Sequence, residues 1–207
     1  MLYEVRMTTT YRYARSAMGG RHLLRLMPTD VPGRQRMMAG SLDISPQPAE
    51  RFDQRDFFGN RTTSVVFEQA HDDIAFTIRA RVERSAHDAL LDITPPLDRL
   101  RDEIDACRSL APDAPAHFLG ASPLVGPDGG VARYAREVAA GAGSALDVVT
   151  ALNRAIHADM VYDSDATTVH TPLTEAFAER RGVCQDFSHI MISCLRSLGI
   201  PAGYVSG

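Results

Sequence analysis

Hydrophobic and polar residues alternate along the first part of the chain. From Tyr3 to Tyr13 the odd-numbered residues are tyrosine, valine, methionine or threonine, and the residues between them are charged or polar. A period of two predicts a strand with one buried face, and the same alternation returns from Ile74 to Val82. The dipeptide Gly59-Asn60 is a hairpin-turn signal between apolar runs. Further strands are predicted in three shorter runs: 21–28, 40–48 and 57–67.

The spacing changes to that of helices after about residue 130. Apolar residues recur at helical intervals in 132–140 and 145–160. A third helix is indicated in 171–182 by a cap, a first-turn proline, two C-terminal arginines and a glycine stop: Thr171, Pro172, Arg180, Arg181 and Gly182. The intervening residues are rich in Pro, Gly and Ala, which is typical of a connector.

These patterns predict an α+β protein in three parts. An N-terminal antiparallel β-sandwich is expected at 1–88, a connector at 89–130 and a mainly helical core at 131–207. A chain of 207 residues is long enough for one large core or two small ones.

A cysteine begins the last predicted helix. Five apolar residues share one face of this helix, and Gly199 ends it: Phe187, Met191, Cys194, Leu195 and Leu198. Cys184 lies three residues before this set, on the same inward side, in the first turn. There the unpaired backbone N–H groups favour negative charge and could hold an oxyanion. Two interpretations stay open: Cys184 is a nucleophile, or it is a small buried residue.

The histidines near this cysteine do not supply an obvious base. Five residues at about 100° each place His189 about 140° around the helix from Cys184, so we expect it to face solvent or to pack against a neighbouring element. His157 and His170 precede the cysteine and could approach it in space. Asp186 suits the dipole of the first turn and needs no chemistry to explain it.

Composition excludes several classes of partner and site. The net charge of −4 gives no reason to expect binding to nucleic acid or to an anionic membrane. Three widely spaced cysteines form neither a disulfide framework nor a zinc pair; Cys194 is expected to pack in the core, and Cys107 to be structural or incidental. No metal or cofactor is expected, since no cluster has ligand spacing. The Met start, the lack of a signal peptide and the lack of a long apolar run favour the cytoplasm.

The segment "RRGVCQDFSHIMISCLRSLGIPAGYVSG" strongly resembles the core motif of bacterial transglutaminase-like proteins. They form a papain-like superfamily whose members are often described as cysteine proteases. "TTTYRY", "LRLMP" and "DFFGN" resemble the β-sandwich that precedes this core, and "HFLGAS" resembles its connector. The resemblance implies a Cys-His-Asp triad with Cys184 as nucleophile, attacking a protein or peptide amide to form a thioester. It also suggests Tyr162 as an aromatic oxyanion helper. The competing interpretation is a strand-borne tyrosine that packs in the core.

The chain departs from this family pattern at its end. In the family the His and Asp follow the cysteine helix on β-strands, whereas this sequence ends at "YVSG" as such a strand begins. We therefore expect a truncated core, inactive alone, within a longer parent enzyme. The alternative is a non-catalytic binding module with a degenerate core. Protease, amidase and transglutaminase activities stay open, although the absence of lysine excludes glutamine–lysine crosslinks within the chain. Exposed strand edges at the truncated end would also permit a homodimer.

Overall fold

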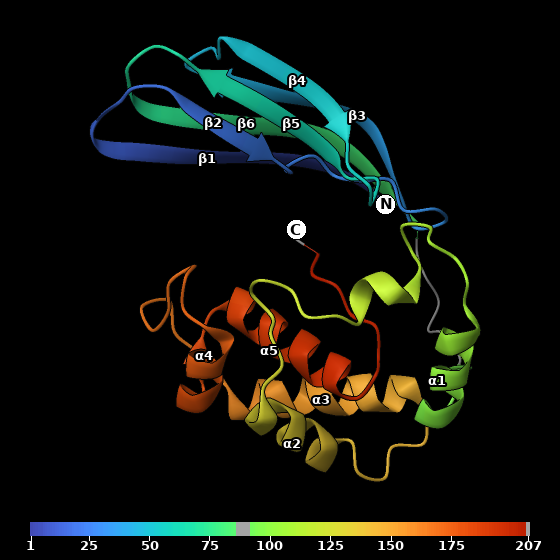
Figure 1. Ribbon diagram of the computed structural model, residues 1–207. Helices are drawn as coiled ribbons and strands as arrows, with labels where there is room; N and C mark the ends of the chain where they lie inside the picture. The colour runs from blue at the N-terminus through green and yellow to red at the C-terminus, as the bar shows by residue number, and fades with distance from the viewer. Residues whose placement is uncertain (86–91, 206–207) are drawn as a thin grey trace. The chain divides into compact units, whose positions relative to one another are not determined.

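The computed structural model describes residues 1–85 and 92–205 (Figure 1). The chain divides into two compact units, Met1–Leu90 and Leu91–Ser206. The boundary expected between residues 88 and 89 lies outside the described residues. No helix in these ranges is long and apolar enough to cross a membrane.

The first unit is a β-sandwich of two antiparallel three-stranded sheets, visible as two layers in Figure 1. One sheet has the order β1-β6-β3 and the other β2-β5-β4. The core draws side chains from both sheets, Phe76 and Ile78 from β6 and Val65 and Phe67 from β5, so the predicted α+β class with an N-terminal sandwich is confirmed. The strands are β1 (Leu2–Ala17), β2 (Gly20–Leu24), β3 (Gln35–Ser45), β4 (Glu50–Arg55), β5 (Arg61–Phe67) and β6 (His71–Arg84).

Strand β1 forms as predicted, but the prediction that its odd-numbered face is buried is wrong. In the ladder with β6, these residues oppose buried positions: Val5 pairs with Ala80, and Met7 with Ile78. They nevertheless stay 37% and 41% exposed. The reason is that β1 is an edge strand of 16 residues, whereas the strands of the facing sheet have only five to seven. Much of β1 therefore extends past the layer that would cover it.

The hairpin turn lies where Gly59-Asn60 indicated, but its first arm was misplaced. Asp56 organises the turn: its carboxylate accepts hydrogen bonds from the backbone and side-chain nitrogens of Asn60 at 2.9 and 3.0 Å. Gly59 takes a φ of 82°, which favours glycine. The arm preceding the turn is β4, not the Phe57-Phe58 pair. All six residues of β4 are exposed, so hydrophobic alternation could not reveal it.

The second unit is a helical core around α5 (Figure 1). Its helices are α1 (Leu97–Ala106), η1 (Pro115–Phe118), α2 (Gly129–Val138), α3 (Ala145–Asp159), α4 (Leu173–Glu179) and α5 (Cys184–Ser197). Helix α2 begins three residues before its expected start because Asp128 caps it, accepting the Val131 N–H at 2.8 Å. α1 and η1 lie within the expected connector, whose Val125 belongs to the core cluster. The C-terminal residues 200–205 form no strand.

The helix-start and helix-end signals predicted for α4 are only partly right. Pro172 is the N-cap residue, and the Thr171 hydroxyl instead accepts the backbone N–H of Thr168 at 2.9 Å. Arg180 ends the helix in the left-handed region, with its guanidinium over the rings of Tyr134 and Phe177 at 4.9 and 4.2 Å. The arginine that follows continues into a short strand, so the two arginines do not serve the helix dipole as a pair.

Candidate active site

Cys184 is held at the start of α5 by a short parallel ladder. Strand β8 (Arg181–Gly182) pairs with β7 (Val161–Tyr162), a segment about 20 residues earlier in the chain. The ladder is anchored at both ends, by Val161 N–H donating to the Arg180 carbonyl and Asp163 N–H donating to the Gly182 carbonyl, each at 2.9 Å. An ion pair between Arg181 and Asp163 at 2.6 Å reinforces it. Val183, the residue before Cys184, therefore connects a hydrogen-bonded strand directly to the first residue of the helix.

A buried carboxylate fixes the first turn of α5. Asp186 is only 2% exposed, and its Oδ2 accepts hydrogen bonds from the Val183 N–H at 2.8 Å and the Thr167 hydroxyl at 2.6 Å. Gly182 leaves the space for it, since a Cβ there would lie 2.6 Å from the same oxygen. Asp186 therefore ties the N-cap backbone and the 163–171 loop together. The sequence signal for this capping interaction is an acidic residue three positions after the N-cap residue.

Cys184 itself is exposed, so its predicted inward orientation is wrong. The buried side of α5 is instead formed by Asp186, His189, Ile190, Ile192, Ser193, Cys194 and Leu195. The core cluster on this helix begins about a turn and a half further along, at Ile190, which leaves the first residue outside it. Burial therefore does not explain this cysteine. In the described ranges no residue is recorded as a hydrogen-bond partner of its thiol.

The other two cysteines differ from Cys184 in instructive ways. Cys194 is fully buried, and burial raises the pKa of its thiol to about 12, which agrees with the expected packing role. Cys107 is exposed like Cys184 but forms the C-cap of α1. Of the two exposed thiols, Cys184 thus lies at the N-terminus of α5 and Cys107 at the C-terminus of α1, which are opposite ends of the helix dipole.

None of the three histidines considered forms a recorded hydrogen bond with Cys184 in the described part of the chain. His189 is buried, and its ring lies 5.5 Å from that of Tyr204, so it packs against a neighbouring segment. His157 is exposed near the end of α3, and His170 is exposed in the loop before α4. The described residues therefore hold a candidate nucleophile without an assembled base.

Tyr162 lies on β7 as the direct partner of Gly182, two residues before the cysteine. It is strand-borne as expected, but it is 67% exposed, so the interpretation as a packed core residue is wrong. Its side chain lines a groove of about 620 Å³ that runs along α3 and α5.

This groove follows the same side of α5 as Cys184. Ser188, Met191 and Leu195 line it, at four, seven and eleven residues after the cysteine, which places them within about 40° of it around the helix. The remaining lining is largely apolar and includes Ile156, Met160 and Phe187. Cys184 is not itself part of the groove lining, but it lies one helical turn before Ser188, which is.

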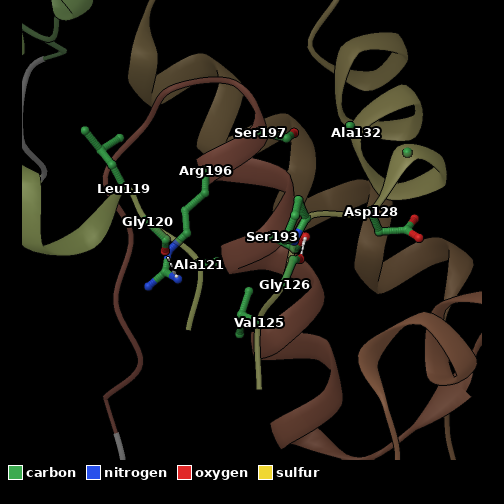
Figure 2. A pocket seen from close by; sticks show the side chains of 12 residues that line it. Leu119, Gly120, Ala121, Val125, Gly126, Asp128, Ala132, Ser193, Arg196 and Ser197 are labelled. Atoms are coloured by element: carbon green, nitrogen blue, oxygen red, sulfur yellow. Dashed lines mark hydrogen bonds between the residues drawn. The ribbon is translucent and has the colours of Figure 1, made fainter. Parts of the chain in front are cut away.

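A second pocket of about 420 Å³ lies at the other end of α5 and does not include Cys184 (Figure 2). Ser193 lies nine residues after the cysteine, about 13 Å along the helix. The Arg196 guanidinium closes one wall, donating to the carbonyls of Gly120 and Ala202 at 2.7 and 2.9 Å and to the Ser122 hydroxyl at 3.2 Å. Arg196 therefore joins the connector, the helix and the C-terminal segment.

The buried His189 gives the stability of this unit a defined pH dependence. Burial lowers its pKa from 6.5, and the negative charge of Asp186 opposes this only in part. Below pH 6.5 the unfolded chain therefore binds a proton that the folded chain resists. Stability should rise with pH through this window and fall as pH drops, by at most about 1.4 kcal/mol per pH unit. Chemical denaturation at pH 5 and pH 7.5 should show a larger difference for the native chain than for His189→Gln. Equal differences would contradict this prediction.

No group of three or more His, Cys, Asp or Glu side chains that could hold a metal ion occurs within residues 1–85 and 92–205.

Two family models match the chain. The one described as "Bacterial transglutaminase-like N-terminal region" matches residues 3–83, and the one described as "Transglutaminase-like superfamily" matches residues 132–207. A crystal structure titled "Putative Cysteine Protease from Cytophaga hutchinsonii" shares the fold, with a TM-score of 0.71 at 19% identity over 97% of this chain and 67% of that one. A sandwich followed by a helical core with a cysteine-initiated helix is thus a transglutaminase-like architecture. The chain belongs to the transglutaminase-like superfamily.

Mycobacterial relatives extend this similarity over nearly the whole chain. Uncharacterized proteins of Mycobacterium tuberculosis and Mycobacterium bovis are each 30% identical over 213 residues, covering 99% of this chain. A protein of Mycobacterium leprae is 44% identical over 59 residues, 28% of this chain and 21% of its own length. The chain spans 65% of the length of the first two relatives.

Proposed function

We propose that this chain carries the nucleophile of a transglutaminase-like cysteine enzyme that acts on protein or peptide amides. The thiolate of Cys184 attacks the amide carbonyl carbon, the C–N bond breaks, and the amine leaves with a proton. The resulting thioester passes its acyl group to water, which gives hydrolysis, or to an amine, which gives transamidation. The observation that carries this proposal is an exposed thiol on the first residue of a helix within the superfamily core.

The local geometry supports the role of this residue. First-turn N–H groups of a helix have no partner one turn earlier, so they can donate to the oxyanion of a tetrahedral intermediate. The buried Asp186 and the β7–β8 ladder hold the start of α5 in place, so these groups need little reorganisation.

We further propose that the activating His and Asp belong to residues that follow 207 in the complete protein. The chain spans 65% of its mycobacterial relatives, which leaves room for a further segment. The groove that begins one helical turn after Cys184, at Ser188, is where we propose that such a segment brings a base toward the thiol. On this proposal the 207-residue chain alone has little or no activity.

Selective alkylation tests the nucleophile without requiring the rest of the enzyme. With limiting iodoacetamide, mass spectrometry should find Cys184 modified several-fold faster than Cys107, since α5 presents its N-terminus and α1 its C-terminus. Cys194 should stay unmodified until the chain unfolds, because it is buried. Modification of Cys107 or Cys194 before Cys184 would count against the assignment.

The alternative is a binding module with a degenerate core, favoured by the lack of any recorded partner for the Cys184 thiol in the described residues. The complete gene product distinguishes the two. An active enzyme needs a His and then an Asp after residue 207, whereas their absence in the translated sequence supports the module.

A further inference from the structure

Strand β1 leaves a long edge of the sandwich unpaired within the described residues (Figure 1). The sheet order β1-β6-β3 gives β1 a neighbour on one side only. Pairing with β6 is regular from Leu2 to Arg12, and the register shifts only beyond Arg12. An edge of this length is a template for another strand unless it is blocked. No proline or bulge interrupts it over these residues.

The hydrogen bonds at one end show which residues face outward. Met1 and Arg84 exchange both backbone hydrogen bonds, at 2.6 and 2.7 Å. Bonding direction alternates along an antiparallel ladder, so the odd-numbered residues of β1 bond to β6. The even-numbered residues from Leu2 to Arg12 therefore direct their N–H and C=O groups toward the open edge.

The side chains of β1 differ between its two faces. Those on one face are largely polar: Glu4, Arg6, Thr8, Thr10 and Arg12. The other face carries the exposed apolar row described above, with Val5, Met7 and Tyr11. A second strand added to this edge must match both faces. Registers that oppose an odd to an even position are excluded, because they place apolar residues against charged ones.

We propose that β1 pairs antiparallel with β1 of a second copy of this chain, about a twofold axis at Thr8. This register places Glu4 opposite Arg12 twice, once on each side of the axis, and Arg6 opposite Thr10. On the other face it places Val5 opposite Tyr11 and Met7 opposite Thr9. Opposite charges and aromatic–aliphatic pairs are both favourable cross-strand neighbours.

Neighbouring registers are less favourable. An axis at Arg6 opposes the two Arg6 side chains, and an axis at Thr9 opposes Arg6 to Arg12; like charges opposite each other destabilise a sheet. An axis at Met7 keeps the whole segment but forms no ion pair. In the proposed register the Arg12 side chain, which has no recorded ion pair in the described residues, gains a carboxylate. About ten backbone hydrogen bonds would join the copies.

Disulfide trapping tests both the edge and the register. In a Cys107→Ser/Cys184→Ser background, Thr8→Cys places two thiols face to face across the axis, within the Cα separation that a disulfide spans. Mild oxidation should convert it to a covalent dimer on non-reducing gels, whereas Met7→Cys, one residue off the axis, should stay largely monomeric. Efficient crosslinking of Met7→Cys with little of Thr8→Cys would overturn the proposed register.

A proline substitution tests the interface without a new thiol. Thr8 directs its N–H away from β6, so Thr8→Pro removes no backbone hydrogen bond of the sandwich, only the Thr8–Thr77 hydroxyl contact at 3.0 Å, and it blocks the edge. The native chain should be a dimer by light scattering at tens of micromolar, and the variant a monomer. Arg12→Glu, which opposes two carboxylates twice, provides a second variant that should also dissociate. The proposal would be overturned by a native chain that is monomeric together with a Thr8→Cys variant that forms no crosslink. Protection of the even-numbered β1 amides from hydrogen exchange in such a monomer would also overturn it, because only those amides face the open edge.

Discussion

Replacing Cys184 with serine should abolish acyl transfer by the complete protein. Removing the nucleophile of a covalent mechanism typically lowers kcat by about 10⁴-fold or more, because an alcohol beside a base tuned for a thiol is a poor nucleophile. Ammonia release from a glutamine peptide and incorporation of an amine into the same peptide would measure hydrolysis and transamidation separately. Because we propose that the base follows residue 207, the assay should use a gene product that includes the residues after 207.

The matched control for this substitution is Cys107→Ser. Both thiols are exposed, so the control reports any general effect of removing a surface thiol. It should leave activity unchanged. Retention of more than a few per cent of the activity by Cys184→Ser would reject Cys184 as the nucleophile, whereas an inactive native protein with normal folding would favour the binding module.

The second large effect is expected from Gly182→Ala. The new Cβ would lie 2.6 Å from Asp186 Oδ2 and 2.9 Å from Asp186 Cβ, closer than real contacts allow. Asp186 would have to move, which disturbs the hydrogen bonds from Val183 and Thr167 to a buried charge. We expect a loss of roughly 3 kcal/mol in the free energy of unfolding. Denaturant titration of the helical unit measures it.

Two further variants make this prediction specific. Gly129 begins α2, and a Cβ added to it would meet no atom within 4 Å, so Gly129→Ala should be neutral or slightly stabilising. In a double-mutant cycle, Gly182→Ala should cost less when Asp186 is already alanine, because the 2.6 Å contact with Oδ2 is gone and only the 2.9 Å approach to the Cβ of residue 186 remains. Strictly additive effects would show that the close approach of Gly182 and Asp186 is not the cause.

The sequence predicted the fold where local patterns were strong. The alternation from Ile74 to Val82 became the buried centre of a sheet, and helical spacing placed α3 and α5 within a residue or two. It missed β4, whose exposed residues carry no hydrophobic signal. It also misjudged the burial of β1, because alternation shows which residues share a face but not whether another layer covers that face.

The candidate site could be predicted only in part, for a similar reason. The motif gave Cys184 as the candidate nucleophile, which stays a prediction, and helix geometry separated it from His189, which the structure places in contact with Tyr204. The hydrogen bond from Thr167 to Asp186 joins residues 19 positions apart in the sequence. The β7–β8 ladder likewise rests on two-residue strands. Such contacts depend on tertiary packing, which propensity and spacing do not encode.

The Arg196 contacts have a practical consequence for dividing this protein into smaller pieces. Composition alone suggests trimming the Pro- and Gly-rich segment and keeping only the helices from residue 131 onward. That truncation would remove Val125 from the hydrophobic core. It would also remove the Gly120 and Ser122 acceptors of the Arg196 guanidinium. A fragment designed around Cys184 should therefore start before Gly120, because the Pro- and Gly-rich segment supplies part of the packing and hydrogen bonding of the helical unit.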